Sequence, residues 1–139
     1  LGIFTTMTPA FAYLSANAAS LGLTDAWQFY SSTGLLSSFL DNTPTAVAFH
    51  SVATGLTADQ IAAFGGNMMA GIPEILLTAI CIGAVFFGAM TYIGNGPNFM
   101  VKAIAEESGV KMPSFFGYMY KFSLIVLLPI YILVQLIFL

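Results

Sequence analysis

The sequence predicts an all-α polytopic membrane protein that contains a re-entrant helical hairpin and a broken transmembrane helix. The first reason is composition, because 58% of the 139 residues are hydrophobic and only 6% are charged, whereas soluble domains are about a quarter charged. The second is that the apolar residues form four long blocks, two of which are interrupted by short runs containing Asn, Thr and Pro. Such interruptions occur at membrane depth only where protein or a cavity surrounds the backbone.

The first element is expected to be a membrane helix over residues 1–20, which Gly22 brings to an end. Because this helix is already apolar at Leu1, we expect the chain to be part of a longer protein. Asp25 and Gln28 have the spacing of a capping box, so the next helix is predicted to begin at Ala26.

Residues 26–56 are predicted to form the re-entrant hairpin. Its arms, 26–40 and 44–56, would be about 22 and 20 Å long as helices. A bilayer core is roughly 30 Å thick, so neither arm spans it, although each reaches past the middle. Residues 41–45, "DNTPT", would form the tip.

The rest of the chain is predicted to contain a loop or short surface helix, a broken helix and a full span. Residues 57–71 are the loop, 72–107 the membrane helix broken at 94–97, and 114–139 the final membrane helix. All three lysines lie in or beside the connection between the last two helices, which is therefore predicted to be cytoplasmic. The 57–71 loop and the C-terminus would then face outside.

The two breaks, "DNTPT" and "TYIGNGPN" (91–98), suit a binding site. Freed backbone carbonyls and Asn and Thr oxygens favour a small hard cation such as sodium. Helix N-termini beginning at Pro44 and Pro97 would instead attract an anionic group. The residues alone leave both options open.

Each candidate residue also has a structural interpretation. Asp41 could cap the second arm, although an intramembrane carboxylate is expensive enough to favour a functional role. Thr43 could be the N-cap ahead of Pro44. His50 is expected to be a hydrogen-bonded packing residue, with a proton relay as the alternative. Asn95 and Asn98, on either side of Gly96 and Pro97, could simply satisfy the backbone of a kinked helix. Gly83, Ala84 and Gly88 are predicted to form a helix-packing face.

Several function classes are disfavoured. Three basic and six acidic residues are too few to indicate a nucleic-acid partner. Cys81 is the single cysteine, which excludes an internal disulfide and a multi-thiolate metal site. The sequence contains no Gly-rich phosphate loop and no apparent Ser–His–Asp set, so we expect neither an enzyme nor a resident cofactor.

A family resemblance rests on "LLSSFLDNTPTAVAF" followed by "GAMTYIGNGPNFMVKAIAEESGVKMPSFFGYM". These motifs resemble the C-terminal half of the ion transporter superfamily, which includes NhaD-type sodium/proton antiporters, citrate transporters and arsenite pumps. The resemblance implies one of two inverted repeats, with a hairpin tip and an unwound segment that move together in an elevator-type mechanism. It places Asp41, Asn42 and Thr43 at the tip, and Thr91, Gly94, Asn95, Pro97 and Asn98 on the unwound segment.

The resemblance implies a secondary active transporter, and we expect sodium/proton antiport. Asp41 would alternate between a sodium ion and a proton, with Asn42 and Asn95 as further sodium ligands. The wider ion or substrate site would add neutral groups from both breaks, namely Thr43, Thr45, Thr91, Gly94, Gly96 and Asn98. Superfamily members that carry dicarboxylates often have Ser-Asn-Thr at the tip, so Asp-Asn-Thr favours cation exchange.

Three alternatives remain at this stage: a sodium-coupled transporter of citrate or another organic anion, a half-helix channel, and a structural membrane subunit. The expected partners are the lipid bilayer, an N-terminal repeat of the same transporter and a second copy in a homodimer, with no nucleic acid. The expected location is the bacterial inner membrane, and sodium and protons would be cargo.

Overall fold

The first helix and the start of the second follow from local capping. A computed structural model of the chain describes residues 2–139. Helix α1 spans Gly2–Ala16, and a 3-10 turn, η1 (Ala18–Leu21), ends at Gly22 with a left-handed φ of 69°. Helix α2 begins at Ala26, and the Gln28 side chain accepts a hydrogen bond from the backbone N–H of Asp25. The capping-box prediction is therefore confirmed, while α1 ends earlier than position 20.

Helices α2 (Ala26–Ser37) and α3 (Asn42–Thr54) form a hairpin whose tip is residues 38–41. Helix α3 begins two residues earlier than predicted, because Asp41 is its N-cap and accepts a hydrogen bond from the Asn42 N–H at 2.8 Å. The interpretation of Thr43 as the N-cap is therefore wrong.

The segment predicted as the 57–71 loop contains regular structure. Helix α4 (Ala58–Phe64) is followed by a two-stranded antiparallel ribbon, β1 (Met68–Met69) with β2 (Ile72–Pro73). The short surface helix is confirmed, but the ribbon was not predicted, because two-residue strands are too short to show alternation. His50 of α3 lies with its Nε2 2.9 Å from the Ala70 carbonyl at the turn of the ribbon, which confirms its packing role.

The broken helix consists of α5 (Glu74–Phe87), a 3-10 turn η2 (Gly88–Met90) and α6 (Gly96–Glu107). The break lies at 88–95, earlier than the predicted 94–97. Regular α-helical bonding already ends at Phe87, and Thr91 is extended, with φ −133° and ψ 164°. Pro97 lies in the first turn of α6, as expected for a residue that can begin a helix.

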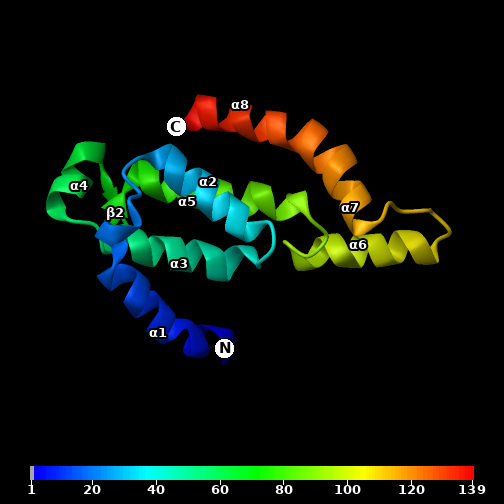
Figure 1. The fold of residues 1–139 in the computed structure, drawn as a ribbon, viewed down its shortest axis with the longest axis horizontal. Coiled ribbons are helices and arrows are strands. Elements are labelled where there is room, and N and C mark those ends of the chain that lie inside the picture. The colour runs from blue at the N-terminus through cyan, green and yellow to red at the C-terminus, as the bar shows by residue number, and fades with distance from the viewer. Residues whose placement is uncertain (1) are drawn as a thin grey trace.

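Helix α5 is the centre of the packing. It contacts both arms of the hairpin, α1 lies along α3, and α6 projects beyond the end of α5 (Figure 1). The predicted packing face of α5 is confirmed, because a Cβ on Gly83 would lie 2.6 Å from the Tyr30 carbonyl of α2. The buried hydrophobic cluster gathers around these contacts and includes Phe29, Tyr30, Val52, Leu76 and Ile80.

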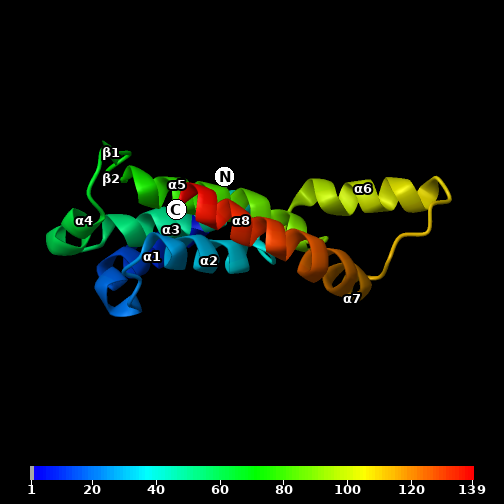
Figure 2. The ribbon, with the colours of Figure 1, turned by 90° about the horizontal axis from the view of Figure 1, so that it is seen from above.

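The final helix runs back along α5, as Figure 2 shows from above. It consists of α7 (Phe115–Tyr118), a π-helical segment η3 (Met119–Leu127) and α8 (Leu128–Phe138). Together these form a helix over Phe115–Phe138, and within residues 2–139 it is the one helix long and apolar enough to cross a bilayer unaided. The chain is thus nearly all-α.

Candidate functional site

The hairpin tip and the break in the α5–α6 helix lie directly against each other. The Thr91 hydroxyl donates a hydrogen bond to the carbonyl of Ser38 at the tip, and the same oxygen accepts from the Gly94 N–H at 3.0 Å. Thr91 is only 2% exposed. Two interruptions some fifty positions apart in the sequence therefore form one polar centre inside an apolar protein.

Asn42 connects the first turn of α3 to this centre. The amide orientation that satisfies its neighbours directs the nitrogen to the carbonyls of Ala84, at 2.9 Å, and Gly94, at 3.2 Å. The Ser37 hydroxyl donates to the same Ala84 carbonyl at 2.6 Å and accepts from the Asn42 nitrogen at 2.9 Å. One asparagine side chain therefore joins the hairpin, α5 and the break.

Two glycines allow this close approach. A Cβ on Gly94 would lie 2.7 Å from the carbonyl oxygens of Gly88 and Ser38 and 2.9 Å from that of Ser37. A Cβ on Gly88 would lie 2.3 Å from the amide of Asn42. Neither glycine has a positive φ, so the requirement for glycine at both positions is steric and not conformational.

Asn98 stabilises the break from the α6 side. Its amide nitrogen donates to the carbonyls of Gly88, at 2.8 Å, and Thr91, at 3.1 Å. Both carbonyls lie where the chain leaves the α-helix and intrahelical donors are missing. This is the structural role that the sequence suggested for Asn98.

The remaining predicted residues lie around this centre. Asp41, Thr43 and Gly96 are exposed in the chain by itself, and Asn95 is partly buried and precedes α6 without a side-chain cap bond. Thr45 is buried, and its hydroxyl donates to the Asp41 carbonyl at 2.9 Å within the first turn of α3. The predicted site thus divides into an inner set (Asn42, Thr91, Gly94 and Asn98), held together by hydrogen bonds, and the other predicted residues, which take no part in those bonds.

The two helix N-termini differ in their electrostatics. The N-terminus of α3 is capped by the carboxylate of Asp41. The N-terminus of α6 has no acidic residue in its first turn and no side-chain cap. Because a helix N-terminus carries a partial positive charge, the start of α6 is the more open of the two to an anionic group.

A cation at this centre would depend on neutral oxygens. Among residues 2–139 no group of three or more His, Cys, Asp or Glu side chains lies together. Asp41 is the single carboxylate within the tip sequence, and the neighbouring oxygens belong to backbone carbonyls and to Asn and Thr side chains. Such a ligand set suits sodium better than a transition metal.

The sequence interpretation missed several residues that build this centre. Ser37 and Ser38 immediately precede the tip within the quoted hairpin motif, so their position could have indicated them. Gly88 and three hydroxyl-bearing residues of the final helix gave no comparable signal, namely Tyr118, Ser123 and Tyr131. Their role depends on the packing of the final helix against the break.

Comparison with known proteins gives one family. The family described as "Putative citrate transport" matches residues 1–139. Neither a curated protein nor a solved structure gives a match.

Proposed function

This chain belongs to the citrate-transport family, and we propose that it is the C-terminal repeat of a secondary active transporter that carries citrate or a related carboxylate together with a cation. Membership of a transport family supports a role in transport. The observation that carries the proposal is the contact between the two helix breaks through Asn42, Thr91 and Gly94. Discontinuous helices that meet at membrane depth are how many secondary transporters build their binding sites.

The choice of a carboxylate substrate rests on the uncapped start of α6. The backbone N–H groups in the first turn of α6, to which Pro97 contributes none, and the helix dipole favour a negatively charged group. At the neighbouring N-terminus Asp41 already supplies such a charge to α3. A carboxylate of the substrate would therefore bind at α6, and its remaining charge would be balanced by a cation.

The cation would bind between Asp41 and the neutral oxygens of the tip. Its positive charge would reduce the repulsion between the Asp41 carboxylate and the bound substrate. Binding of each ion would then favour binding of the other, and this mutual preference is sufficient to couple their movement.

A second candidate is sodium/proton antiport, which the position of Asp41 favours. A lone carboxylate at a hairpin tip could hold either a sodium ion or a proton, and competition between them would couple the two movements. In this version Asn42 and Asn95 would supply further oxygen ligands, and no carboxylate substrate would be required. For both candidates we also propose an N-terminal repeat as partner, assembly as a homodimer, and a location in the bacterial inner membrane.

The deciding experiment is uptake of radiolabelled citrate by liposomes containing the purified transporter. We expect saturable uptake that is accelerated by an inward sodium or proton gradient. Sodium-dependent proton movement in the absence of citrate would select antiport instead. Flux that rises linearly with concentration would contradict both and indicate a channel.

Asp41→Asn tests the role of the carboxylate, because it keeps the shape of the side chain and can still accept a hydrogen bond. We expect it to remove the acceleration by the gradient. Asp59→Asn, at an exposed carboxylate of α4, is the matched control and should transport normally. Unchanged coupling in Asp41→Asn would mean that the cation binds elsewhere.

A further inference from the structure

Side chains of the final helix hold the carbonyls at the end of α5. The Tyr131 hydroxyl donates to Phe86 at 2.5 Å, the Tyr118 hydroxyl to Ala89 at 2.9 Å, and the Ser123 hydroxyl to Met90 at 2.5 Å. The Phe86 carbonyl also accepts the Gly88 N–H, whereas the carbonyls of Ala89 and Met90 lie beyond the end of α5, where intrahelical N–H partners are missing. A carbonyl left without a partner in an apolar surrounding is costly, and the final helix supplies the missing donors.

The π-helical segment explains how two of these donors face the break together. In an α-helix, side chains five positions apart point in directions about 140° apart. In a π-helix each residue bonds to the one five positions along, so residues five positions apart lie much closer to the same side of the helix. The η3 segment (Met119–Leu127) directly follows Tyr118 and contains Ser123, and it therefore brings both hydroxyls to the same side of the helix.

Further contacts bind the same regions together. Ser123 is fully buried, and the Tyr30 hydroxyl of α2 donates to the Tyr131 carbonyl at 3.0 Å. Tyr92, within the break, stacks on Tyr118 with ring centroids 4.6 Å apart.

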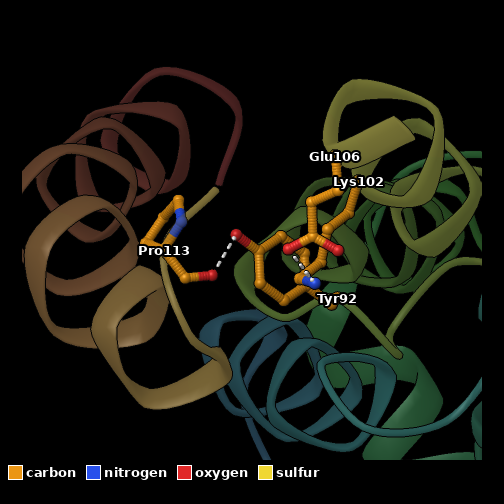
Figure 3. A network of polar contacts seen from close by, with 4 residues as sticks. All are labelled: Tyr92, Lys102, Glu106 and Pro113. Carbon is orange, nitrogen blue, oxygen red and sulfur yellow. Dashed lines mark hydrogen bonds and ion pairs between the residues drawn. The ribbon is translucent and has the colours of Figure 1, made fainter. Parts of the chain in front are cut away.

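Tyr92 also connects the break to the segment that precedes the final helix. Its hydroxyl donates to the Pro113 carbonyl at 3.1 Å, and the Lys102 ammonium, which is paired with Glu106, lies 5.5 Å from its ring centroid (Figure 3). The end of α5 and the first part of the break, from Phe86 to Tyr92, are therefore attached to the C-terminal part of the chain.

Apolar packing alone does not hold the break against the final helix. A pocket of ≈ 230 Å³ lies between the hairpin tip, the break and the final helix, so side chains do not fill this contact completely. Its lining includes Phe39 of the tip, Met90 of the break and Leu124 of η3. The hydroxyl–carbonyl bonds are directional, so they can fix the position of the backbone where this packing is incomplete.

We propose that Tyr118 and Ser123 are positioning residues of the transport site. By holding the carbonyls of Ala89 and Met90, they set the place where Thr91 and Gly94 meet the hairpin tip. The final helix and the break then move as one body during transport. The effect on transport rests on the proposed function, whereas the effect on the backbone of the break does not.

The test compares Tyr118→Phe and Ser123→Ala with Tyr120→Phe in the purified transporter. Tyr118→Phe removes one hydroxyl and keeps the ring that stacks on Tyr92. Tyr120 lies on the same helix and is 62% exposed, so its variant is the matched control. Amide hydrogen exchange is measured in residues 88–95 without substrate, and citrate uptake is measured in liposomes.

Loss of one hydrogen bond is expected to accelerate exchange in residues 88–95 by about 5-fold and to raise the KM for citrate by a similar factor. The maximal uptake rate should stay near that of the parent, since the site is still assembled when substrate is saturating. The double variant should exchange faster than either single variant.

Unchanged exchange in both single variants, or an equal increase in Tyr120→Phe, would overturn the proposal. A uniform rise in exchange throughout the chain would also overturn it, because that result indicates general destabilisation. Faster exchange confined to 88–95 in a protein that transports neither citrate nor a related carboxylate would support the positioning role and reject the proposed function.

Discussion

Gly94 and Gly96 are two positions apart, but only Gly94 lacks room for a side chain. A Cβ on Gly94 would meet three carbonyl oxygens within 2.9 Å, whereas a Cβ on Gly96 would have nothing within 4 Å. Gly94→Ala should therefore push the break away from the hairpin tip. We expect it to reduce the free energy of unfolding by about 1–3 kcal/mol and to weaken apparent substrate affinity.

Gly96→Ala is the matched control for the stability of that variant, and it should leave the free energy of unfolding unchanged or slightly higher because Gly96 lies at the start of a helix. It is not a control for uptake, since the substrate carboxylate is proposed to bind at the start of α6. Thermal unfolding in detergent and uptake in liposomes measure the two effects. An equal free energy of unfolding in the two alanine variants would show that the close contacts of Gly94 do not stabilise the protein. From the sequence alone, both glycines were expected to contribute to the site.

Ala70 and Gly71 form a second contrasting pair, at the turn of the β1–β2 ribbon. Both have a left-handed backbone, with φ of 53° at Ala70 and 81° at Gly71. Left-handed conformations cost a residue with a Cβ about 1–2 kcal/mol. Ala70→Gly should raise the free energy of unfolding by about 0.5–1 kcal/mol after the greater entropy of unfolded glycine is subtracted. Gly71→Ala should lower it, and chemical denaturation of the two variants should show opposite shifts.

At the residue scale, the sequence predicted the positions of the segments that form the candidate site well, but it predicted the roles of the individual side chains less well. Asp41 and Asn42 were both singled out, but their neighbouring roles differ: one caps α3, and the other reaches the carbonyls of Ala84 and Gly94. Capping follows from local sequence. The contacts of Asn42 depend on where α5 packs, and no local pattern contains that information.

At the element scale, the packing of α2 on α5 depends on small residues. A Cβ on Gly83 would lie 2.6 Å from the Tyr30 carbonyl, and one on Gly34 would lie 2.5 Å from the Phe87 ring. Small residues at such contacts let helix backbones approach closely. Gly83→Ala should therefore separate the helices and lower the free energy of unfolding by about 1–3 kcal/mol.

Val85→Ala provides the comparison on the same helix, because Val85 is 61% exposed. It should change stability much less than Gly83→Ala. Thermal unfolding of both variants in the same detergent measures the difference. If Val85→Ala were as damaging as Gly83→Ala, close backbone packing would not explain the requirement for glycine.

Helix starts and ends were predictable at Gly22, the Asp25–Gln28 pair and Pro97, because these residues act on the backbone within a few positions of themselves. The β1–β2 ribbon and the π-helical segment η3 were not predicted. The ribbon has two residues per strand, and η3 has the same apolar composition as an α-helical span. Both features are fixed by tertiary contacts, such as those of His50 with Ala70 and of Ser123 with Met90.

At the scale of the whole molecule, two segments predicted to face outside lie near each other, and the segment predicted to face the cytoplasm lies at the opposite end. Helix α4 and the connection between α6 and α7 are at the two ends of the long axis (Figure 1). Phe138 lines a pocket with Phe64 and Glu74, so the end of α8 lies beside the end of α4. The orientation in the membrane and the number of membrane crossings are proposals.

Cysteine labelling tests this orientation in intact cells. Exposed Cys81 is first replaced by serine, and single cysteines are then introduced as Asp59→Cys, Ser108→Cys and Leu139→Cys. We expect a membrane-impermeant maleimide to label positions 59 and 139 from outside. Position 108 should react only after the membrane is opened, because the neighbouring lysines favour the cytoplasmic side. Labelling of 59 and 108 from the same side would be incompatible with a bilayer perpendicular to the long axis.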